Sequence, residues 1–173
     1  MSRDQLYLFP EFDPNVTLIK NIDYIDLTKI KQSENIVSKT SHYDVLEPGR
    51  FTLFKTGGTH RWRKKLGNNM PYILNNETGK IIVLSLVKSY PRACIWTRGQ
   101  TDKCNINMHR LVAEAFVVNK DPVNNKIVHH INEDKLDYRV TNLAWVTSGQ
   151  NSMGLKRPRD ENYEVKKIKS GIL

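Results

Sequence analysis

The sequence contains little cysteine, no long apolar run, and no internal repeat or low-complexity tract. Its two cysteines, Cys94 and Cys104, cannot form a four-thiolate zinc site or a disulfide framework, and we expect both to be reduced thiols. A membrane-spanning helix needs about 18 apolar residues in a row, whereas the longest apolar stretch, residues 81–87, already contains Ser85. These absences favour a globular protein without membrane association.

The first 40 residues offer few functional signals. Residues 1–5 lack an apolar segment of signal-peptide length, so we expect the protein to stay where it is made. We expect this compartment to be the cytoplasm, or the nucleus if the host is eukaryotic. The apolar and aromatic cluster Leu6–Phe12 is expected to pack on the body of the protein, since exposed aromatic clusters are a liability. We treat residues 1–40 as an N-terminal arm of unknown role.

Positive charge is concentrated in the middle of the chain. The formal net charge is +9, and residues 41–110 carry +8, from 12 basic and 4 acidic side chains. The tail, residues 152–173, carries +3, from 6 basic and 3 acidic side chains. A basic segment of this size is typical of a polyanion binder, because cations that neutralise phosphates release counterions. The alternative is a solvated basic face that keeps the protein soluble.

Residues 41–107 show a pattern of short strands separated by turns. Stretches rich in β-branched and aromatic residues predict strands at Arg50–Phe54, Lys80–Val87 and Cys104–Met108. Between the first two strands lies a basic loop around one tryptophan, and its candidate DNA-binding residues are Arg61, Trp62, Arg63, Lys64 and Lys65. Cations beside an aromatic ring suit a phosphate backbone together with a groove or stacking contact. The alternative is a basic loop whose tryptophan folds back onto the core.

The next segment predicts an ordered series of short elements. An amphipathic helix is expected at His109–Phe116, where apolar residues share one face. Strands are expected at Lys126–Ile131 and Leu143–Thr147, separated by a polar loop, and a helix start follows with Ser148 as its N-cap. The order is therefore helix, strand, long loop, strand and helix.

Two adjacent histidines on the first of these strands suit phosphodiester hydrolysis. Neighbouring residues on a strand point to opposite faces, so one ring of the pair His129–His130 can face a metal and the other a water molecule. Histidine suits the general base because its ordinary pKa of about 6.5 leaves it mostly neutral at pH 7. Asn151, in the first turn of the following helix, is placed to supply a second metal ligand.

The span from His109 to Asn151 resembles the HNH (ββα-metal) endonucleases, particularly the intron-type homing enzymes of phages and viruses. The matching motifs are Met108–Phe116, Val128–Ile131 with Lys135 downstream, Thr141–Thr147 and Asn151. This resemblance implies a metal-dependent DNA endonuclease of homing or nicking type that leaves 5′-phosphate and 3′-hydroxyl ends. DNA is then the expected partner, and the chain acts as a monomer or a homodimer.

The resemblance also assigns roles to individual residues. It makes His130 the general base, His129 and Asn151 the metal ligands, and Asn142 an architectural residue whose side chain bonds to loop backbone. Many relatives have aspartate at the position of His129 and a different loop at residues 132–135. Imidazole favours Mn²⁺ or another transition metal over Mg²⁺ as the divalent cofactor. His109 is open to a structural or a functional interpretation, and we favour the structural one.

These patterns predict an α+β fold in which a strand-rich DNA-binding segment precedes a ββα-metal nuclease domain. The expected divisions are the arm at 1–40, the basic segment at 41–107, the nuclease domain at 108–154 and a basic tail at 155–173. Two other functions stay open: a catalytically inactive DNA-binding protein with the HNH fold, and a viral nucleic-acid-associated structural protein. The altered loop at residues 132–134 is consistent with the first of them.

Overall fold

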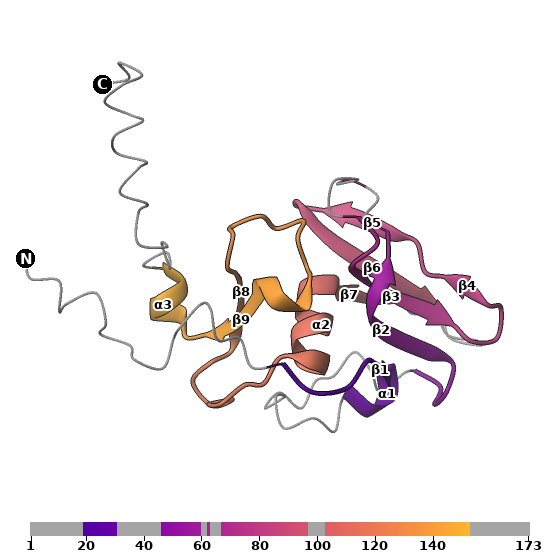
Figure 1. The fold of residues 1–173 in the computed structure, drawn as a ribbon, viewed down its shortest axis with the longest axis horizontal. Coiled ribbons are helices and arrows are strands. Elements are labelled where there is room, and N and C mark those ends of the chain that lie inside the picture. The colour runs from indigo at the N-terminus through magenta and orange to yellow at the C-terminus, as the bar shows by residue number, and fades with distance from the viewer. Residues whose placement is uncertain (1–18, 31–45, 60–61, 63–66, 97–102, 153–173) are drawn as a thin grey trace, which may run out of the picture.

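The computed structural model describes residues 19–30, 46–59, 62, 67–96 and 103–152. The described part combines three small antiparallel sheets with short helices (Figure 1). The α+β class expected from the sequence, with a strand-rich region before a strand–strand–helix unit, is confirmed. No helix in the described ranges is long and apolar enough to cross a membrane.

The first sheet has four strands in the order β1-β2-β3-β4. The strands are β1 (Tyr24–Asp26), β2 (Phe51–Gly58), β3 (Met70–Asn75) and β4 (Lys80–Ile81), with helix α1 (Leu27–Ile30) directly after β1. Phe51 and Leu53 of β2 and Met70 and Ile73 of β3 are buried in the core, as expected for a sheet with one buried face.

The second sheet has three strands in the order β5-β6-β7. It consists of β5 (Leu84–Val87), β6 (Tyr90–Trp96) and β7 (Lys103–Asn107). Lys88 and Ser89, which join β5 to β6, both have left-handed backbone with φ of 48° and 67°. Positive φ at both central residues is the signature of a tight two-residue hairpin, which fixes where Tyr90 begins the next strand.

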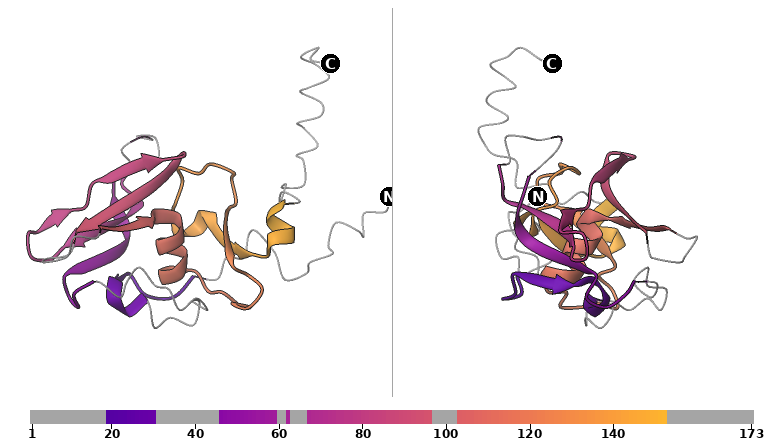
Figure 2. Two further views of the ribbon diagram at one scale, coloured as in Figure 1. Left: turned by 180° about the vertical axis from the view of Figure 1, so that it is seen from behind. Right: turned by 90° about the vertical axis from the view of Figure 1, so that its right-hand side faces the viewer.

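Helix α2 (Met108–Phe116) follows β7 and lies between the second sheet and a third, two-stranded one (Figures 1 and 2). The third sheet pairs β8 (Ile127–His130) with β9 (Leu143–Val146), and a single 3-10 turn, η3 (Val140–Asn142), precedes β9. Helix α3 (Ser148–Ser152) ends the described chain.

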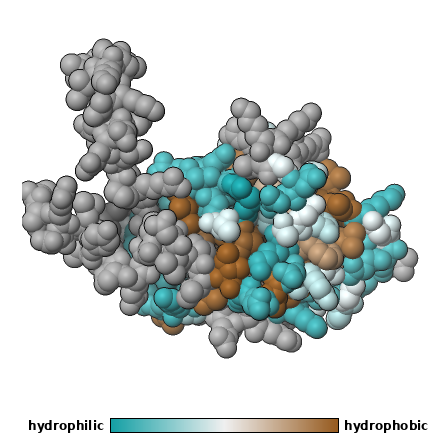
Figure 3. Space-filling model, viewed as in Figure 1, coloured by the Kyte–Doolittle hydropathy of each residue, from teal (hydrophilic) through white to brown (hydrophobic). Residues whose placement is uncertain are grey.

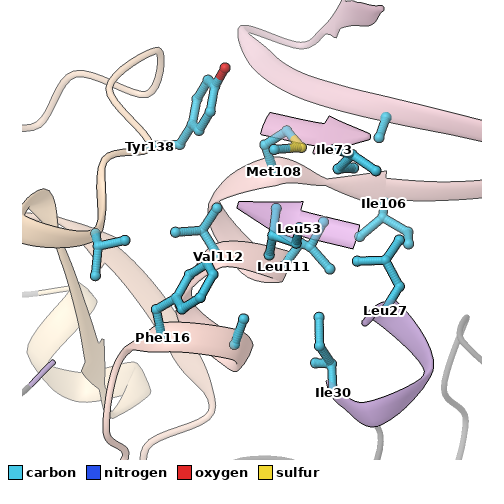
Figure 4. Close-up of a cluster of buried hydrophobic side chains, with 14 of the residues drawn as sticks. Leu27, Ile30, Leu53, Ile73, Ile106, Met108, Leu111, Val112, Phe116 and Tyr138 are labelled. Atoms are coloured by element: carbon cyan, nitrogen blue, oxygen red, sulfur yellow. The ribbon is translucent and has the colours of Figure 1, made fainter. Parts of the chain in front are cut away.

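One hydrophobic core joins these parts. Leu111, Val112 and Phe116 of α2 are fully buried and pack among side chains from the first sheet, the second sheet and β9 (Figure 4). The indole Nε1 of Trp145 on β9 also donates a hydrogen bond of 3.3 Å to the backbone oxygen of Val117, just after α2. The strand–strand–helix unit therefore shares its core with the strands that precede it.

Two local predictions were wrong. The expected strand Lys80–Val87 is broken into β4 and β5, which belong to different sheets. The N-cap of α3 is Thr147 rather than Ser148. The Thr147 amide donates to Oε1 of Gln150 (2.8 Å), and the Gln150 amide donates to Oγ1 of Thr147 (3.2 Å). This reciprocal pair is a capping box, which satisfies two amides that the first helical turn leaves unpaired.

The face shown in Figure 3 carries both hydrophilic and hydrophobic residues, the latter in patches. Apolar side chains at the surface include Ile81 and Val83, which are 55% and 71% exposed near the break between β4 and β5. Cys94 on β6 is a free, half-buried thiol, and the strand register places it opposite Asn105.

Candidate active site

Strand β8 presents its two histidines to different neighbours. His129 is half-buried and faces helix α3, whereas His130 is buried and faces helix α2. The pleat of a strand produces this division, because successive side chains leave on opposite faces. The register of β8 with β9, which pairs His129 with Ala144 and His130 with Leu143, fixes which face each ring occupies.

His129 and Asn151 come together from positions 22 residues apart. Nδ1 of His129 lies 3.3 Å from Oδ1 of Asn151. Helix α3 holds Asn151 in place, since the Asn151 amide donates to the backbone oxygen of Thr147 at 3.1 Å within the capped turn. The Asn151 side chain is exposed, so the pair opens to solvent.

The pair fits a divalent cation with further positions left for water or substrate. An imidazole nitrogen and an amide oxygen 3.3 Å apart are close enough to bind one ion together. Nε2 of His129 is buried and has no hydrogen-bond partner within the described part of the chain, whereas Nδ1 is directed at Asn151. Within the described ranges no group of three His, Cys, Asp or Glu side chains forms a richer metal site. A neutral nitrogen and oxygen donor set suits Mn²⁺ and similar transition metals.

His130 is held in its neutral form. It is 6% exposed, and burial lowers its pKa to about 4, with the neighbouring His129 acting in the same direction. The nearby carboxylates of Asp137 and Asp134 oppose this effect but do not reverse it. At pH 7 the imidazole therefore carries an unprotonated nitrogen that can accept a proton.

The rings of His109 and Tyr90 lie beside the ring of His130, and the sequence analysis did not place Tyr90 at the site. The ring centroid of His109, on α2, lies 5.0 Å from that of His130, and the Tyr90 ring lies 4.8 Å from His109 and 6.1 Å from His130. Nζ of Lys135 lies 5.0 Å from the Tyr90 ring centroid. Burial, followed by the charges of His130 and Arg110, lowers the pKa of His109 to about 3, so this ring is neutral as well.

The loop between β8 and β9 is fastened by Asn142. Its Oδ1 accepts from the Asn132 amide (3.0 Å), and its Nδ2 donates to Oδ1 of Asn132 (2.9 Å) and to the backbone oxygen of Asp137 (2.7 Å). The backbone oxygen of Asn142 also accepts from the Ile131 amide, directly after His130. These bonds join the loop to the end of the strand that carries both histidines.

An ion pair between the buried Asp137 and the half-buried Arg139 reinforces the same loop. Arg139 contacts Asp137 with Nε and Nη2 at 2.8 and 2.7 Å. Burial opposes ionisation of Asp137, but the hydrogen bonds from Arg139 and Asn132 hold its pKa below the ordinary value. The carboxylate stays charged, and the two-pronged contact fixes the loop geometry.

Most of the candidate DNA-binding loop lies outside the described residues. This applies to Arg61, Arg63, Lys64 and Lys65. Trp62 is half-buried and lines a pocket that also includes Tyr138 from the β8–β9 loop. The tryptophan shares this pocket mainly with residues of the first sheet, and its role in DNA binding stays a prediction.

Comparison with known proteins shows which family this part of the chain resembles. Residues 107–153 match the HNH endonuclease family, which confirms the resemblance read from the sequence motifs. Two uncharacterized HNH endonucleases of Acanthamoeba polyphaga mimivirus are similar to the chain. L247 is 41% identical over 90 residues, 52% of this chain and 22% of the relative. L245 is 33% identical over 85 residues, 49% of this chain and 24% of the relative.

One solved structure is also similar: that of the HNH homing endonuclease I-HmuI, described by its DNA binding and cleavage. Its identity to the chain is 23%, with a TM-score of 0.44, over 71% of this chain and 63% of the other. The chain thus spans about a quarter or less of the two viral relatives and less than two thirds of the solved one.

Proposed function

We propose that this protein is a metal-dependent DNA endonuclease of homing or nicking type. The observation that carries the proposal is the convergence of His129 and Asn151, 3.3 Å apart, beside the neutral imidazole of His130. The family match over residues 107–153 supports a nuclease, the class of enzyme expected from the sequence. The basic charge of residues 41–110 supports DNA as the substrate.

His129 and Asn151 would hold one divalent cation through Nδ1 and Oδ1. When bound, such an ion neutralises charge on the scissile phosphate and stabilises the departing oxygen. The donor set favours Mn²⁺ or another transition metal over Mg²⁺, because imidazole is a softer ligand than carboxylate. One such unit in a chain cuts one strand, so a monomer would nick and a dimer would cut both strands.

His130 would act as the general base. Nε2 of this ring is buried, with no hydrogen-bond partner in the described ranges, so we assign proton acceptance to Nδ1. The low pKa of His130 keeps the proton-accepting form populated at pH 7 but makes the imidazole a weak base. A weak base of this kind suits a water molecule whose own pKa would be lowered by the cation. Asn142 supports the base indirectly by fastening the strand end that carries it.

The burial of His130 favours a second candidate function. With only 6% of the residue exposed, a phosphate has little direct access to the ring. An HNH-fold protein that binds DNA without cutting it would show this arrangement. This candidate predicts retained DNA binding and no nicking in any divalent metal.

A nicking assay on supercoiled plasmid separates the two candidate functions. The parental chain, His130→Ala and the surface control Lys120→Ala, which lies outside the site, are incubated with Mg²⁺, Mn²⁺, Co²⁺ or Zn²⁺. Nicking by the parental and control chains in Mn²⁺, its loss in His130→Ala and equal DNA binding by all three support the nuclease. Equal nicking by His130→Ala would refute the assigned base, and binding without nicking by every chain would favour the second candidate.

A further inference from the structure

We propose that Tyr90 is a positioning residue that fixes the orientation of the His130 imidazole, and that it does so from outside the segment that matches the HNH family. Tyr90 belongs to β6, whereas the matching segment begins at residue 107. The inference deepens the proposed function and rests on the assignment of His130 as the base.

The rings of Tyr90, His109 and His130 form one cluster. Tyr90 contacts both histidines, at ring-centroid distances of 4.8 and 6.1 Å, and the two histidines lie 5.0 Å apart. The three rings are tilted against one another by 36° to 51°. Tilted aromatic pairs at such distances are favourable beyond their buried area.

Ring packing takes the place of a hydrogen bond at one nitrogen of each histidine. Nε2 of His130 and Nδ1 of His109 are both buried and have no hydrogen-bond partner among the residues that the structure describes. Catalytic histidines are commonly oriented by a hydrogen bond on the second ring nitrogen. At Nε2 of His130 that restraint is missing, so the adjacent rings have to limit rotation of the imidazole.

The β5–β6 hairpin holds Tyr90 rigidly enough for this role. Tyr90 directly follows the two-residue turn of Lys88 and Ser89, and it pairs with Val87 across the hairpin. The next residue, Pro91, is buried and restricts the backbone on the other side. A ring on such a short, paired hairpin has little freedom to withdraw from His130.

The test compares Tyr90→Leu, which removes the flat ring, with Tyr90→Phe, which keeps it. Tyr24→Leu is the matched control, since Tyr24 lies on β1 with 65% of its surface exposed. Misplacing a catalytic group by about 1 Å can lower a rate by roughly a hundredfold. We expect single-turnover cleavage by Tyr90→Leu to fall by about tenfold to a hundredfold, with DNA affinity within about twofold of the parental value. Tyr90→Phe and Tyr24→Leu should stay near the parental rate.

A second measurement does not depend on cleavage. In metal-free protein, the ¹H–¹⁵N signals of the His130 ring should shift and broaden in Tyr90→Leu and stay close to parental in Tyr90→Phe. If the parental chain cuts no DNA in any metal, the proposed function fails, and these ring signals still decide whether Tyr90 positions His130. Unchanged ring signals in Tyr90→Leu would overturn the inference.

A mutant cycle separates positioning of His130 from other effects. In His130→Ala with imidazole added as a substitute base, adding Tyr90→Leu should cause no further loss, because the ring to be positioned is gone. A further tenfold loss of activity in this double variant would overturn the inference. The inference would also fail if Lys135→Met lost as much activity as Tyr90→Leu, since Tyr90 would then act through Lys135. If circular dichroism shows Tyr90→Leu to be unfolded, Tyr90→Met replaces it in every arm.

Discussion

Replacing Asn142 by alanine should destabilise the protein more than its small change in volume suggests. The Asn142 side chain is buried and makes three hydrogen bonds, two with Asn132 and one with the backbone oxygen of Asp137. A hydrogen bond contributes about 1 kcal/mol net, and a buried group left unsatisfied costs about 1–3 kcal/mol. Water can reach the exposed Asn132 but not the buried bond to Asp137, so we expect a loss of about 3 kcal/mol in the free energy of unfolding.

Urea and thermal unfolding measure this loss. For a protein of this size, about 3 kcal/mol corresponds to a fall in Tm of about 6–12 °C. Asn76→Ala is the matched control, because Asn76 also donates two hydrogen bonds, to Gly49 (2.7 Å) and Thr52 (2.9 Å), but is exposed. Its loss should stay within about 0.5 kcal/mol, as for most surface changes.

The comparison refutes the reasoning if Asn142→Ala costs no more than Asn76→Ala. Burial of the loop bonds would then contribute nothing measurable. Asn142→Asp extends the test, since a carboxylate would face the oxygens of Asn132 and Asp137 that now accept from Nδ2. We expect Asn142→Asp to be at least as unstable as Asn142→Ala at pH 7.

Three further predictions follow from the same site. His129→Asp should shift the preferred metal from Mn²⁺ toward Mg²⁺ in the plasmid assay, because carboxylate is the harder ligand; an unchanged preference for Mn²⁺ would contradict the ligand role. The free energy of unfolding should fall as the pH drops below about 6.5, by up to about 1.4 kcal/mol per pH unit for each buried histidine. The fall should end for each histidine below its lowered pKa, about 4 for His130 and about 3 for His109. The unfolded chain binds these protons first, so His109→Phe should flatten the urea-derived slope, and an unaltered slope would count against burial as the cause. Thr147→Ala should remove about 1 kcal/mol of local helix stability and raise the Mn²⁺ concentration needed for half-maximal cleavage. Tm should change little, because α3 has no buried residue. If the variant needs no more Mn²⁺ than the parental chain, the cap does not hold Asn151.

Local patterns in the sequence predicted most of the helices and strands around the site. The amphipathic spacing at residues 109–116 predicted α2, and apolar runs on either side of a polar loop predicted β8 and β9. Three strands were missed: β1, β3 and β6. Strand β1 is only three residues long, and β3 and β6 each have proline as their second residue. Proline donates no ladder hydrogen bond, so such runs are weak strand signals until neighbouring strands are known.

The surroundings of His130 could not be read in the same way. The adjacency of His129 and His130 is visible in the sequence. The polar run Ser148–Asn151 predicts the start of a helix, which places Asn151 in its first turn. Tyr90 reaches the ring only because a hairpin packs against α2, and no periodicity at residue 90 signals that contact. Contacts between elements distant in sequence depend on tertiary packing, which local propensity does not determine.

Paramagnetic broadening by Mn²⁺ tests the shared metal site most directly. In ¹H–¹⁵N spectra of the parental chain, the ring signals of His129 and the side-chain amide of Asn151 should broaden together at the same Mn²⁺ concentration, before signals elsewhere. In Asn151→Ala, broadening at His129 should require more Mn²⁺. Broadening that begins at other residues, or at His129 alone with no effect of Asn151→Ala, would contradict the shared site.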